Sequence, residues 1–500
     1  ISVEKSQDSN GLTIKSLAYE ILEVMIPTII SFACVFLQET INIIFVGKNI
    51  EVSEQKYAIN GIGSANLYIN CTMLYISLGL LNGFNILGGN AISQGKNYLF
   101  GCYFQRSLLI SLSFLVLAII VQNFVISYGL ELIGAKGRSL EYGEEYATIS
   151  MYFVVVEIIF QSAFTYLNLI GKSFIAVVIL VIFTCIDPLW LMFFVNKLDM
   201  GPKGAAWSLL ITQFCSAFTA MTYIMIKKPI KDSIFCFNKN SIKSWGSYLS
   251  MGIPTCLLLC FEWWAYDLQQ IVVSHSSSSD KEIQLSTQIV ATSVFQIAYC
   301  IGIAMLTVNS ILAAKYASLG KVNELKKSFW LCTGIGTGLT LVVCAIFLGL
   351  STKVLEIFTD DPEVIEEGEK VMPYICLSIL LGGIRSSLQG FLVGVRKELF
   401  TTVVCFSSYY IVIFGLSILF VLVLDFGDLG VWISTSVGYG LISLVFIVKI
   451  LLIDYDQVIK ETKEGMAKDH AALNKINDQD EEESICEEYV DNNKEVLVNK

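Results

Sequence analysis

Long apolar stretches recur along most of the chain, and short polar segments separate them. A helix of about 20 apolar residues crosses the hydrocarbon core of a bilayer, so each stretch predicts one membrane-spanning helix. The predicted spans are residues 17–46, 58–83, 106–127, 147–170, 174–196, 204–226, 248–274, 285–312, 329–350, 371–394, 400–424 and 429–453. The pattern predicts an all-α integral membrane protein with twelve transmembrane helices.

Short motifs of the first six spans return in the last six. Ile-Pro-Thr stands at Ile26–Thr28 in the first span and at Ile253–Thr255 in the seventh. Further matches in the same order are Gly95 with Gly320, Gly143 with Gly368, and Gly204-Ala-Ala-Trp207 with Gly430-Val-Trp432. Because six is an even number, both halves insert the same way up. We expect two parallel six-helix repeats around a central cleft, an architecture typical of transporters.

The polar segment Lys227–Trp245, with five lysines, divides the halves. The predicted regions are a cytoplasmic N-terminal segment 1–16, an N-lobe 17–226, a cytoplasmic inter-lobe loop 227–247, a C-lobe 248–453 and an acidic tail 454–500. The tail is expected to be cytoplasmic and disordered. The bias of lysine and arginine among the loops places both termini in the cytoplasm. The sequence leaves open a plasma membrane or a vacuolar or endosomal membrane.

Composition agrees with this class. The chain is 54% hydrophobic and 15% charged, whereas soluble domains average roughly 25% charged residues. The net charge of −11 comes mainly from the tail, which holds 14 acidic and six basic residues. The sequence has no basic face of the kind that binds nucleic acid. The expected partners are membrane lipids and a small-molecule substrate, and the protein is expected to be a monomer. No cofactor or metal is expected, because the 14 cysteines are scattered and only two histidines occur.

An ionisable residue near the bilayer centre costs about 2.5–3.5 kcal/mol to insert, and six residues inside the predicted spans are candidates for such a position. They are Glu39, Glu157, Asp187, Glu262, Asp267 and Arg385. Such residues mark ion or substrate pathways, so each one is a candidate for function.

Glu262 and Asp267 flank Trp263 and Trp264 in the seventh span. Five residues rotate a helix by about 500°, so the two carboxylates point about 140° apart and could line one cavity from two angles. A carboxyl that is protonated on one side of the membrane and deprotonated on the other couples a proton gradient to transport. The tryptophans offer faces that attract organic cations. Alternatively, the acids are structural and the tryptophans form an interfacial belt.

Two further acids have polar surroundings in the sequence. Asp187 precedes Pro188, which removes a backbone donor and frees a carbonyl near the carboxylate. This pair predicts a cation or proton site, or alternatively a helix-end cap. Glu39 lies beside Gln38 and about one turn before Asn42, so the three are expected to share a face.

The two remaining charges have open roles. Glu157 and Arg385 could form a charge pair between the lobes. Alternatively, the Arg385 side chain could reach the membrane interface.

These residues resemble those of the multidrug and toxic compound extrusion (MATE) transporters, particularly the eukaryotic branch. The most specific match is Pro254 followed by Cys260-Phe-Glu-Trp-Trp-Ala-Tyr-Asp267. Others are Phe45-Val-Gly47, Asn70 with Gly79, Phe104-Gln-Arg-Ser-Leu-Leu109, Ile186-Asp-Pro188, Phe358-Thr-Asp360, Leu388-Gln389 with Gly394, and Tyr409-Tyr410. The resemblance covers residues 17 to 453.

The resemblance implies an antiporter that exports organic cations, drugs or metabolites in exchange for H+ or Na+ by alternating access. The coupling acids of the family fall on Glu262, Asp267 and Asp187, and Glu39 is a fourth candidate because of its own polar surroundings. The expected cavity-lining residues are Trp263, Trp264, Gln38, Asn42, Asn70, Asn85, Arg385 and Gln389.

Some positions depart from the family pattern. Asn42 stands where relatives carry an aspartate, and Asn85 replaces an acid of some members. The acid of the tenth span falls on Ser386, beside Arg385. This exchange puts ordinary cation selectivity in doubt and admits a zwitterionic or anionic substrate.

Two other classes compete with this interpretation. A lipid-linked precursor flippase of related architecture would carry a basic central cavity, whereas the one expected here is acidic apart from Arg385. A non-transporting receptor or scaffold would use the acidic tail to bind a partner. A membrane enzyme is not expected, because the sequence offers no nucleophile–base pair or metal cluster.

Overall fold

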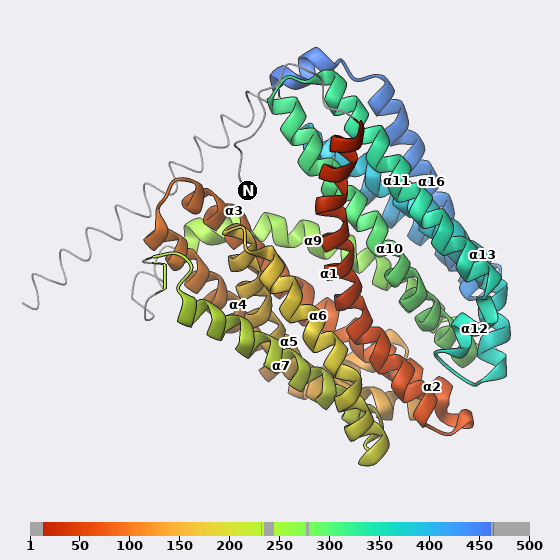
Figure 1. The fold of residues 1–500 in the computed structure, drawn as a ribbon. Coiled ribbons are helices and arrows are strands. Elements are labelled where there is room, and N and C mark those ends of the chain that lie inside the picture. Colours follow the sequence, from red (N-terminus) through yellow and green to blue (C-terminus); the bar gives the residue numbers. More distant parts are fainter. Residues whose placement is uncertain (1–13, 232, 235–244, 277–279, 462–463, 465–500) are drawn as a thin grey trace, which may run out of the picture.

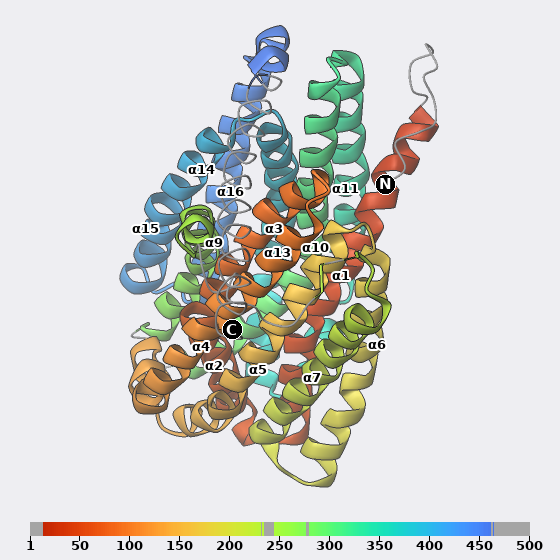
Figure 2. The ribbon, with the colours of Figure 1, turned by 90° about the vertical axis from the view of Figure 1, so that its left-hand side faces the viewer.

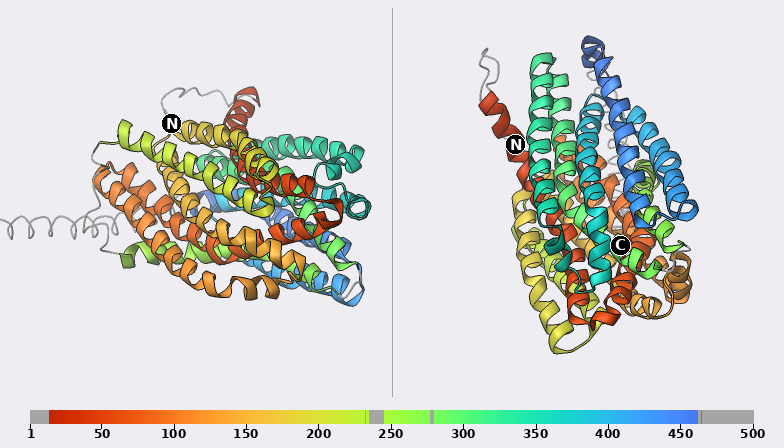
Figure 3. Two further views of the ribbon diagram at one scale, coloured as in Figure 1. Left: turned by 90° about the horizontal axis from the view of Figure 1, so that it is seen from below. Right: turned by 90° about the vertical axis from the view of Figure 1, so that its right-hand side faces the viewer.

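The computed structural model describes residues 14–231, 233–234, 245–276, 280–461 and 464 of the chain. The N-lobe consists of α1 (Ile14–Asn49), α2 (Val52–Ile69), α3 (Tyr75–Ser93), α4 (Asn97–Ile133), α5 (Arg138–Leu169), α6 (Ser173–Leu191) and α7 (Gly201–Lys227). The C-lobe consists of α9 (Trp245–Ser274), α10 (Lys281–Ser318), α11 (Val322–Gly349), α12 (Ser351–Glu356), α13 (Pro362–Gly394), α14 (Glu398–Ser407), α15 (Phe414–Ser417) and α16 (Asp428–Leu451). Figures 2 and 3 show the helices of both lobes running along one common direction.

The predicted fold class is confirmed. Eleven helices of the described chain are long and apolar enough to cross a membrane. The seventh predicted span is α9, a helix of 30 residues and thus about 45 Å long, which exceeds the hydrocarbon thickness of about 30 Å. Most helices extend beyond the predicted spans, since their polar ends continue the same hydrogen-bond ladder outside the apolar stretch.

Local chemistry fixes where several helices begin and end. Asp361 caps α13 by accepting a hydrogen bond from the Glu363 amide at 3.0 Å, and Pro362 occupies the first turn, where no amide donor is needed. The long helix α4 ends at Gly134, whose φ of 108° suits glycine.

Four π-helical segments interrupt the spans within the described ranges. They are η1 (Asn70–Leu74) between α2 and α3, η2 (Met192–Lys197) after α6, and η3 (Ser408–Ile413) and η4 (Ile418–Val423) around α15. A wider turn changes the direction in which the following side chains point, and such segments are frequent at functional sites. The segment η1 joins α2 and α3 into one continuous span, Val52–Ser93.

The two lobes meet through two equivalent helix pairs. The first span, α1, packs along α10 of the opposite lobe, and its repeat counterpart α9 packs along α3. Figure 1 shows α1 between the helices of the two lobes. Since α3 and α10 are themselves counterparts, the two contacts are related by the same pseudo-symmetry as the sequence motifs. Through this crossed pairing, α1 and α9 each contact both lobes.

Glycine permits one of these close approaches. A Cβ atom on Gly79 of α3 would lie 2.5 Å from Cα of Cys256 on α9. No larger residue fits there without moving one helix, because the obstacle is backbone. Gly79 therefore brings α3 and α9 into backbone contact at the lobe interface.

Inter-lobe hydrogen bonds gather at one end of the molecule, which we call the distal end because it lies opposite the start of α1. Figure 1 shows α2 and α12 together there. Gln55 of α2 is 1% exposed, and its Oε1 accepts hydrogen bonds from Thr359 Oγ1 at 2.7 Å and from the Asp360 amide at 2.8 Å. Lys48 also forms an ion pair with Asp360.

A second distal contact joins α2 to α10. Asn60 donates to Glu282 Oε2 at 2.6 Å, and Ser286 donates to Asn60 Oδ1 at 2.9 Å. Fewer polar bonds cross between the lobes at the opposite end, where Glu20 of α1 accepts from Lys315 and Tyr316 of α10. The distal end is therefore held closed by a polar network.

The first part of the predicted tail is ordered. Residues 455–461 are helical, whereas the sequence placed them in a disordered segment. Val458 is buried, and Lys326 lies 4.0 Å from the centre of the Tyr455 ring. Apolar burial and these contacts hold the helix on the C-lobe. Most of the remaining tail, 465–500, lies outside the described residues.

The distal network predicts a local effect of Gln55→Ala. The Asp360 amide loses its acceptor, and an unmade buried hydrogen bond costs about 1–3 kcal/mol. Hydrogen–deuterium exchange of peptides covering 355–363 should therefore accelerate by about tenfold or more. The matched control is Asn49→Ala, because Asn49 is exposed and bonds only the Phe45 carbonyl of its own helix. Unchanged exchange in Gln55→Ala would show that the Gln55 contact does not hold this end closed.

Candidate functional site

Asp267 of α9 lies against the N-lobe. Its Oδ2 accepts a hydrogen bond from Cys71 Sγ at 3.0 Å, and the Tyr75 hydroxyl is a second partner. Cys71 belongs to η1, so the π-helical turn presents this thiol to α9. A carboxylate that belongs to the C-lobe by sequence is thus bound by side chains of the N-lobe.

Glu39 of α1 joins the same group of residues. Its Oε1 accepts from Asn70 Nδ2 at 3.3 Å, and it lies within electrostatic range of Asp267. We call Glu39, Asn70, Cys71, Tyr75 and Asp267 the interface cluster. The cluster draws on α1, η1, α3 and α9, the elements that meet between the lobes.

The two tryptophans of α9 also face the N-lobe. Trp263 stacks on Tyr75 with ring centres 5.5 Å apart, and Trp264 Nε1 donates to the Cys71 carbonyl at 3.1 Å. Both rings are half-buried. They therefore border the interface cluster, and neither forms part of a belt of exposed aromatic rings.

Glu262 points away from Asp267 and toward the C-lobe. It is half-buried and lies within electrostatic range of Cys405, Tyr409 and Tyr439. Because of the predicted angle between them, the two carboxylates face different lobes.

Asp187 of α6 is fully buried inside the N-lobe. Its Oδ1 accepts from Ser208 Oγ at 2.8 Å and from Thr212 Oγ1 at 2.7 Å, both on α7. Its Oδ2 makes no hydrogen bond with any described group. The carboxylate therefore bonds to another helix and does not cap its own, and it keeps one oxygen open for a proton or cation.

The polar residues expected to share one face of α1 have partners on different helices. Gln38 donates to Thr184 Oγ1 of α6 at 3.1 Å, whereas Glu39 bonds to η1. Asn42 is fully buried close to Tyr146, which also lies within electrostatic range of Glu39 and Asp187. Tyr146 therefore stands between the interface cluster and Asp187.

Glu157 and Arg385 do not form the charge pair that the sequence suggested. Glu157 accepts from Gln161 of its own helix at 2.7 Å and lies within electrostatic range of Glu39. Arg385 is 0% exposed in the C-lobe, so it does not reach the membrane interface either. Its Nη1 donates to Gln389 Oε1 at 2.5 Å, and its Nη2 to the Tyr299 hydroxyl.

Asn85 lies apart from these groups. It is exposed on α3 and donates to Asn82 Oδ1 at 2.8 Å. Asn85 therefore lies outside the interface cluster, although one continuous span carries both Asn70 and Asn85.

Comparison with known proteins gives two matches to one family model, MatE, over residues 27–189 and 254–419. The two matches begin at Pro27 and Pro254, the prolines of the repeated Ile-Pro-Thr motif. Together they cover more than half of the chain. The chain belongs to the MATE family of transporters.

Two curated relatives and one solved structure illustrate the relationship. Multidrug and toxin extrusion protein 2 of Oryctolagus cuniculus is 29% identical over 56% of this chain and 45% of its own length. Multidrug and toxin extrusion protein 1 of Danio rerio is 23% identical over 92% of this chain and 76% of its own length. The matched part thus spans less than half of the rabbit protein. The eukaryotic MATE transporter AtDTX14 has a TM-score of 0.72 at 17% identity, over 90% of this chain and 99% of its own.

For this MATE protein, sequence reasoning located the charges and two of their partners, Asn70 and Gln389, but missed the others. Cys71, Tyr75, Ser208, Thr212 and Tyr299 were not singled out, because hydroxyl and thiol side chains are common in transmembrane helices. The π-helical turn at η1, which turns Cys71 toward Asp267, leaves no pattern in a single sequence.

The geometry around Asp187 predicts a difference between two substitutions. Asp187→Asn keeps an oxygen that accepts from Ser208 and Thr212, whereas Asp187→Leu leaves both hydroxyls without this acceptor. Asp187→Leu should lose about 1–3 kcal/mol of stability relative to Asp187→Asn. Thermal unfolding of the purified variants measures this, with the exposed neighbour Cys185→Leu as control. Equal unfolding temperatures for the two variants would contradict the assignment.

Proposed function

We propose that this MATE protein is a secondary active antiporter, which exports small organic molecules in exchange for H+ or Na+ by alternating access. The observation that carries the proposal is the position of Asp267. This carboxylate sits at the lobe interface and is bonded by Cys71 of the opposite lobe. A proton or cation that binds there changes the strength of a contact between the two moving parts.

The helix α9 is suited to transmit such a change. Asp267 faces the N-lobe, whereas the adjacent Tyr266 hydroxyl lies 3.3 Å from the Tyr409 hydroxyl of the C-lobe. Successive residues of a helix point about 100° apart, so one turn of α9 contacts both lobes. Loss of charge at Asp267 removes a charge-assisted acceptor, and such bonds are about twice as strong as neutral ones.

Alternating access then consists of breaking and remaking polar contacts at the two ends. The network of Gln55 and Asn60 closes the distal end. The lysine and arginine bias of the sequence assigns this end to the side opposite the cytoplasm. The described state is on this basis closed to the outside, and opening requires the distal hydrogen bonds to be exchanged for water.

Organic cations are the expected substrates on the α9 side of the site. Glu262 and Asp267 supply negative charge, and Trp263 supplies an aromatic face beside Tyr75. Small polar groups, Cys71 and Asn70, add hydrogen-bonding partners. The coupling ion binds at a carboxylate, with Glu262 as the main coupling group and Asp267, Glu39 and Asp187 as further ones.

The proposal predicts that Glu262→Gln folds and reaches its membrane but does not use an imposed pH gradient. The amide keeps the shape of the side chain and cannot ionise. Uptake of a radiolabelled organic cation, benzyltrimethylammonium, into proteoliposomes should rise with the gradient in the parent, and should not in the variant. Glu262→Asp should keep part of the effect, because its charge survives on a shorter stem.

The control for this experiment is Glu51→Gln, since Glu51 is an exposed carboxylate in the turn between α1 and α2. It should respond to the gradient as the parent does. Gradient-driven uptake by Glu262→Gln equal to that of the parent would show that Glu262 is structural. In that case the matched variants Asp267→Asn and Asp187→Asn would test the remaining carboxylates.

The topology gives a separate prediction. Lysines gather in the inter-lobe loop, so both ends of the chain are assigned to the cytoplasm. Epitope tags added at either end of a protein expressed at the cell surface should bind antibody only after permeabilisation. A tag introduced in the turn at residues 134–137, between α4 and α5, serves as the opposite control and should bind without permeabilisation. Labelling of an end tag in intact cells would refute this orientation.

A further inference from the structure

We propose that Arg385 is the centre of a site in the C-lobe that binds the anionic group of a transported molecule. The inference rests on the proposed transport function and adds to it a substrate class: molecules that carry a carboxylate or sulfonate group, alone or together with a positive charge.

The charge of Arg385 is not neutralised by the protein. The side chain is 0% exposed, and it forms no ion pair with any carboxylate in the described part of the chain. Its hydrogen-bond partners among the described residues are uncharged: Gln389 Oε1, the Tyr299 hydroxyl, Ser386 Oγ at 3.2 Å and Cys405 Sγ at 4.0 Å. Buried charges in proteins are normally paired, so a guanidinium without a carboxylate calls for an external counter-ion.

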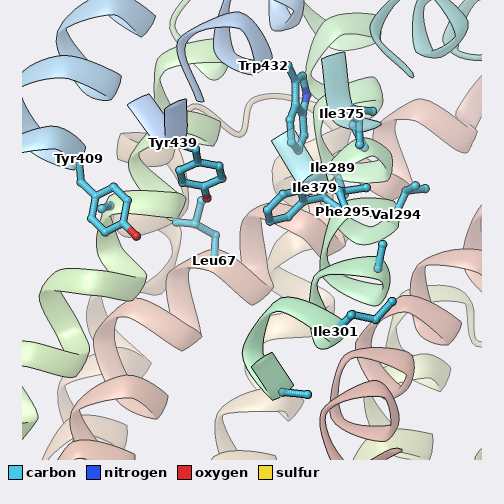
Figure 4. Packing of buried hydrophobic residues seen from close by; sticks show 14 of the residues in the cluster. Leu67, Ile289, Val294, Phe295, Ile301, Ile375, Ile379, Tyr409, Trp432 and Tyr439 are labelled. Atoms are coloured by element: carbon cyan, nitrogen blue, oxygen red, sulfur yellow. The ribbon is translucent and has the colours of Figure 1, made fainter. Parts of the chain in front are cut away.

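Aromatic rings surround the guanidinium, and one of its donors is unused. Cζ of Arg385 lies 5.2 Å from the centre of the Tyr439 ring and 5.8 Å from that of Tyr409. Figure 4 shows these two rings next to each other, with both hydroxyls turned to the same side. Ring faces hold the cation but accept no proton from it. The Nε atom of Arg385 makes no hydrogen bond with any described group.

The free Nε matters because an anion binds the guanidinium along an edge. A carboxylate or sulfonate accepts two parallel N–H bonds from arginine, a geometry that a single amide oxygen such as that of Gln389 does not match. Either hydroxyl can donate in the 2.7 Å hydrogen bond between Tyr299 and Ser386, and when Ser386 donates, the Tyr299 proton is free to face the anion. The site thus has more donors than the protein uses.

The residues around Arg385 differ in exposure. Tyr266, Tyr299 and Gln389 are half-buried, whereas Arg385 and Tyr439 are fully buried behind them. A Cβ atom on Gly382 would lie 3.1 Å from both the Tyr299 and the Tyr439 rings. Glycine at this position lets the two rings approach the helix α13 that carries Arg385.

The nearby carboxylate of Glu262 does not neutralise the charge of Arg385. Glu262 of α9 lies within electrostatic range of Tyr409 and Tyr439 and forms no ion pair with Arg385. The two opposite charges therefore flank the same group of tyrosines. A molecule with one positive and one negative group can satisfy both, which is why the substrate class includes zwitterions.

The test compares two probes with the same ring and opposite charge, benzoate and benzyltrimethylammonium. Binding of each radiolabelled probe is measured at equilibrium with purified full-length protein in nanodiscs, without any gradient. The parent should bind both. Arg385→Gln should weaken benzoate binding by about 10- to 100-fold, because a charged hydrogen-bonded contact is lost. The same variant should bind benzyltrimethylammonium at least as well as the parent.

Two variants guard against a folding defect. Tyr299→Phe keeps Arg385 and removes only one hydroxyl, and it should weaken benzoate binding about tenfold or less. Arg106→Gln is the matched control, because Arg106 of α4 is 1% exposed and lies 5.2 Å from the Tyr103 ring centre. It should leave the preference between the two probes unchanged. If Arg385→Gln cannot be purified, Tyr299→Phe decides the question.

Each outcome has one meaning. Benzoate affinity that is unchanged in Arg385→Gln or, failing that, in Tyr299→Phe overturns the anion site, as does a parent that binds only the cation. Equal loss of benzoate binding in Arg106→Gln also overturns it. Because binding needs no gradient, these results are independent of gradient-driven uptake. Arg385-dependent benzoate binding without any driven uptake would reject the antiport proposal and keep the site.

Discussion

Every charged group placed inside the membrane needs a partner that does not come from water. The chain meets this constraint differently in its two lobes. In the N-lobe, Asp187 is bonded by two hydroxyls of the next helix. At the lobe interface, Asp267 is bonded by a thiol and a tyrosine of the opposite lobe. In the C-lobe, Arg385 has only neutral partners and aromatic faces. The three groups therefore differ in how far the protein itself compensates their charge.

The crossed pairing of helices gives these groups their arrangement. Because α1 packs along α10 and α9 along α3, each lobe sends its first helix to the other. Glu39 and Asp267 lie on these two helices and meet in one cluster. A change at the cluster acts on both crossing helices at once, which connects ion binding with the relative position of the lobes. The distal network around Gln55 then sets which end is closed.

Opposite charges are distributed on the two sides of α9. Asp267, Trp263 and Trp264 face the N-lobe, whereas Glu262 and Tyr266 face the tyrosines around Arg385. One helix thus borders an acidic region and a basic one. If both proposals hold, a substrate bound beside α9 meets both regions, and its charge pattern, more than its net charge, decides how well it fits.

The sequence by itself determined the membrane class, the twelve spans, the repeat and the positions of the six candidate charges, because hydrophobicity and motif order are properties of the chain alone. Only the tertiary structure decided the partners. Glu157 and Arg385 lie in separate clusters, although opposite charge suggested a pair. The π-helical turn at η1 presents Cys71 to Asp267, and the helix 455–461 packs on the C-lobe. These contacts join residues far apart in sequence, and their geometry depends on how helices pack, which no local pattern encodes.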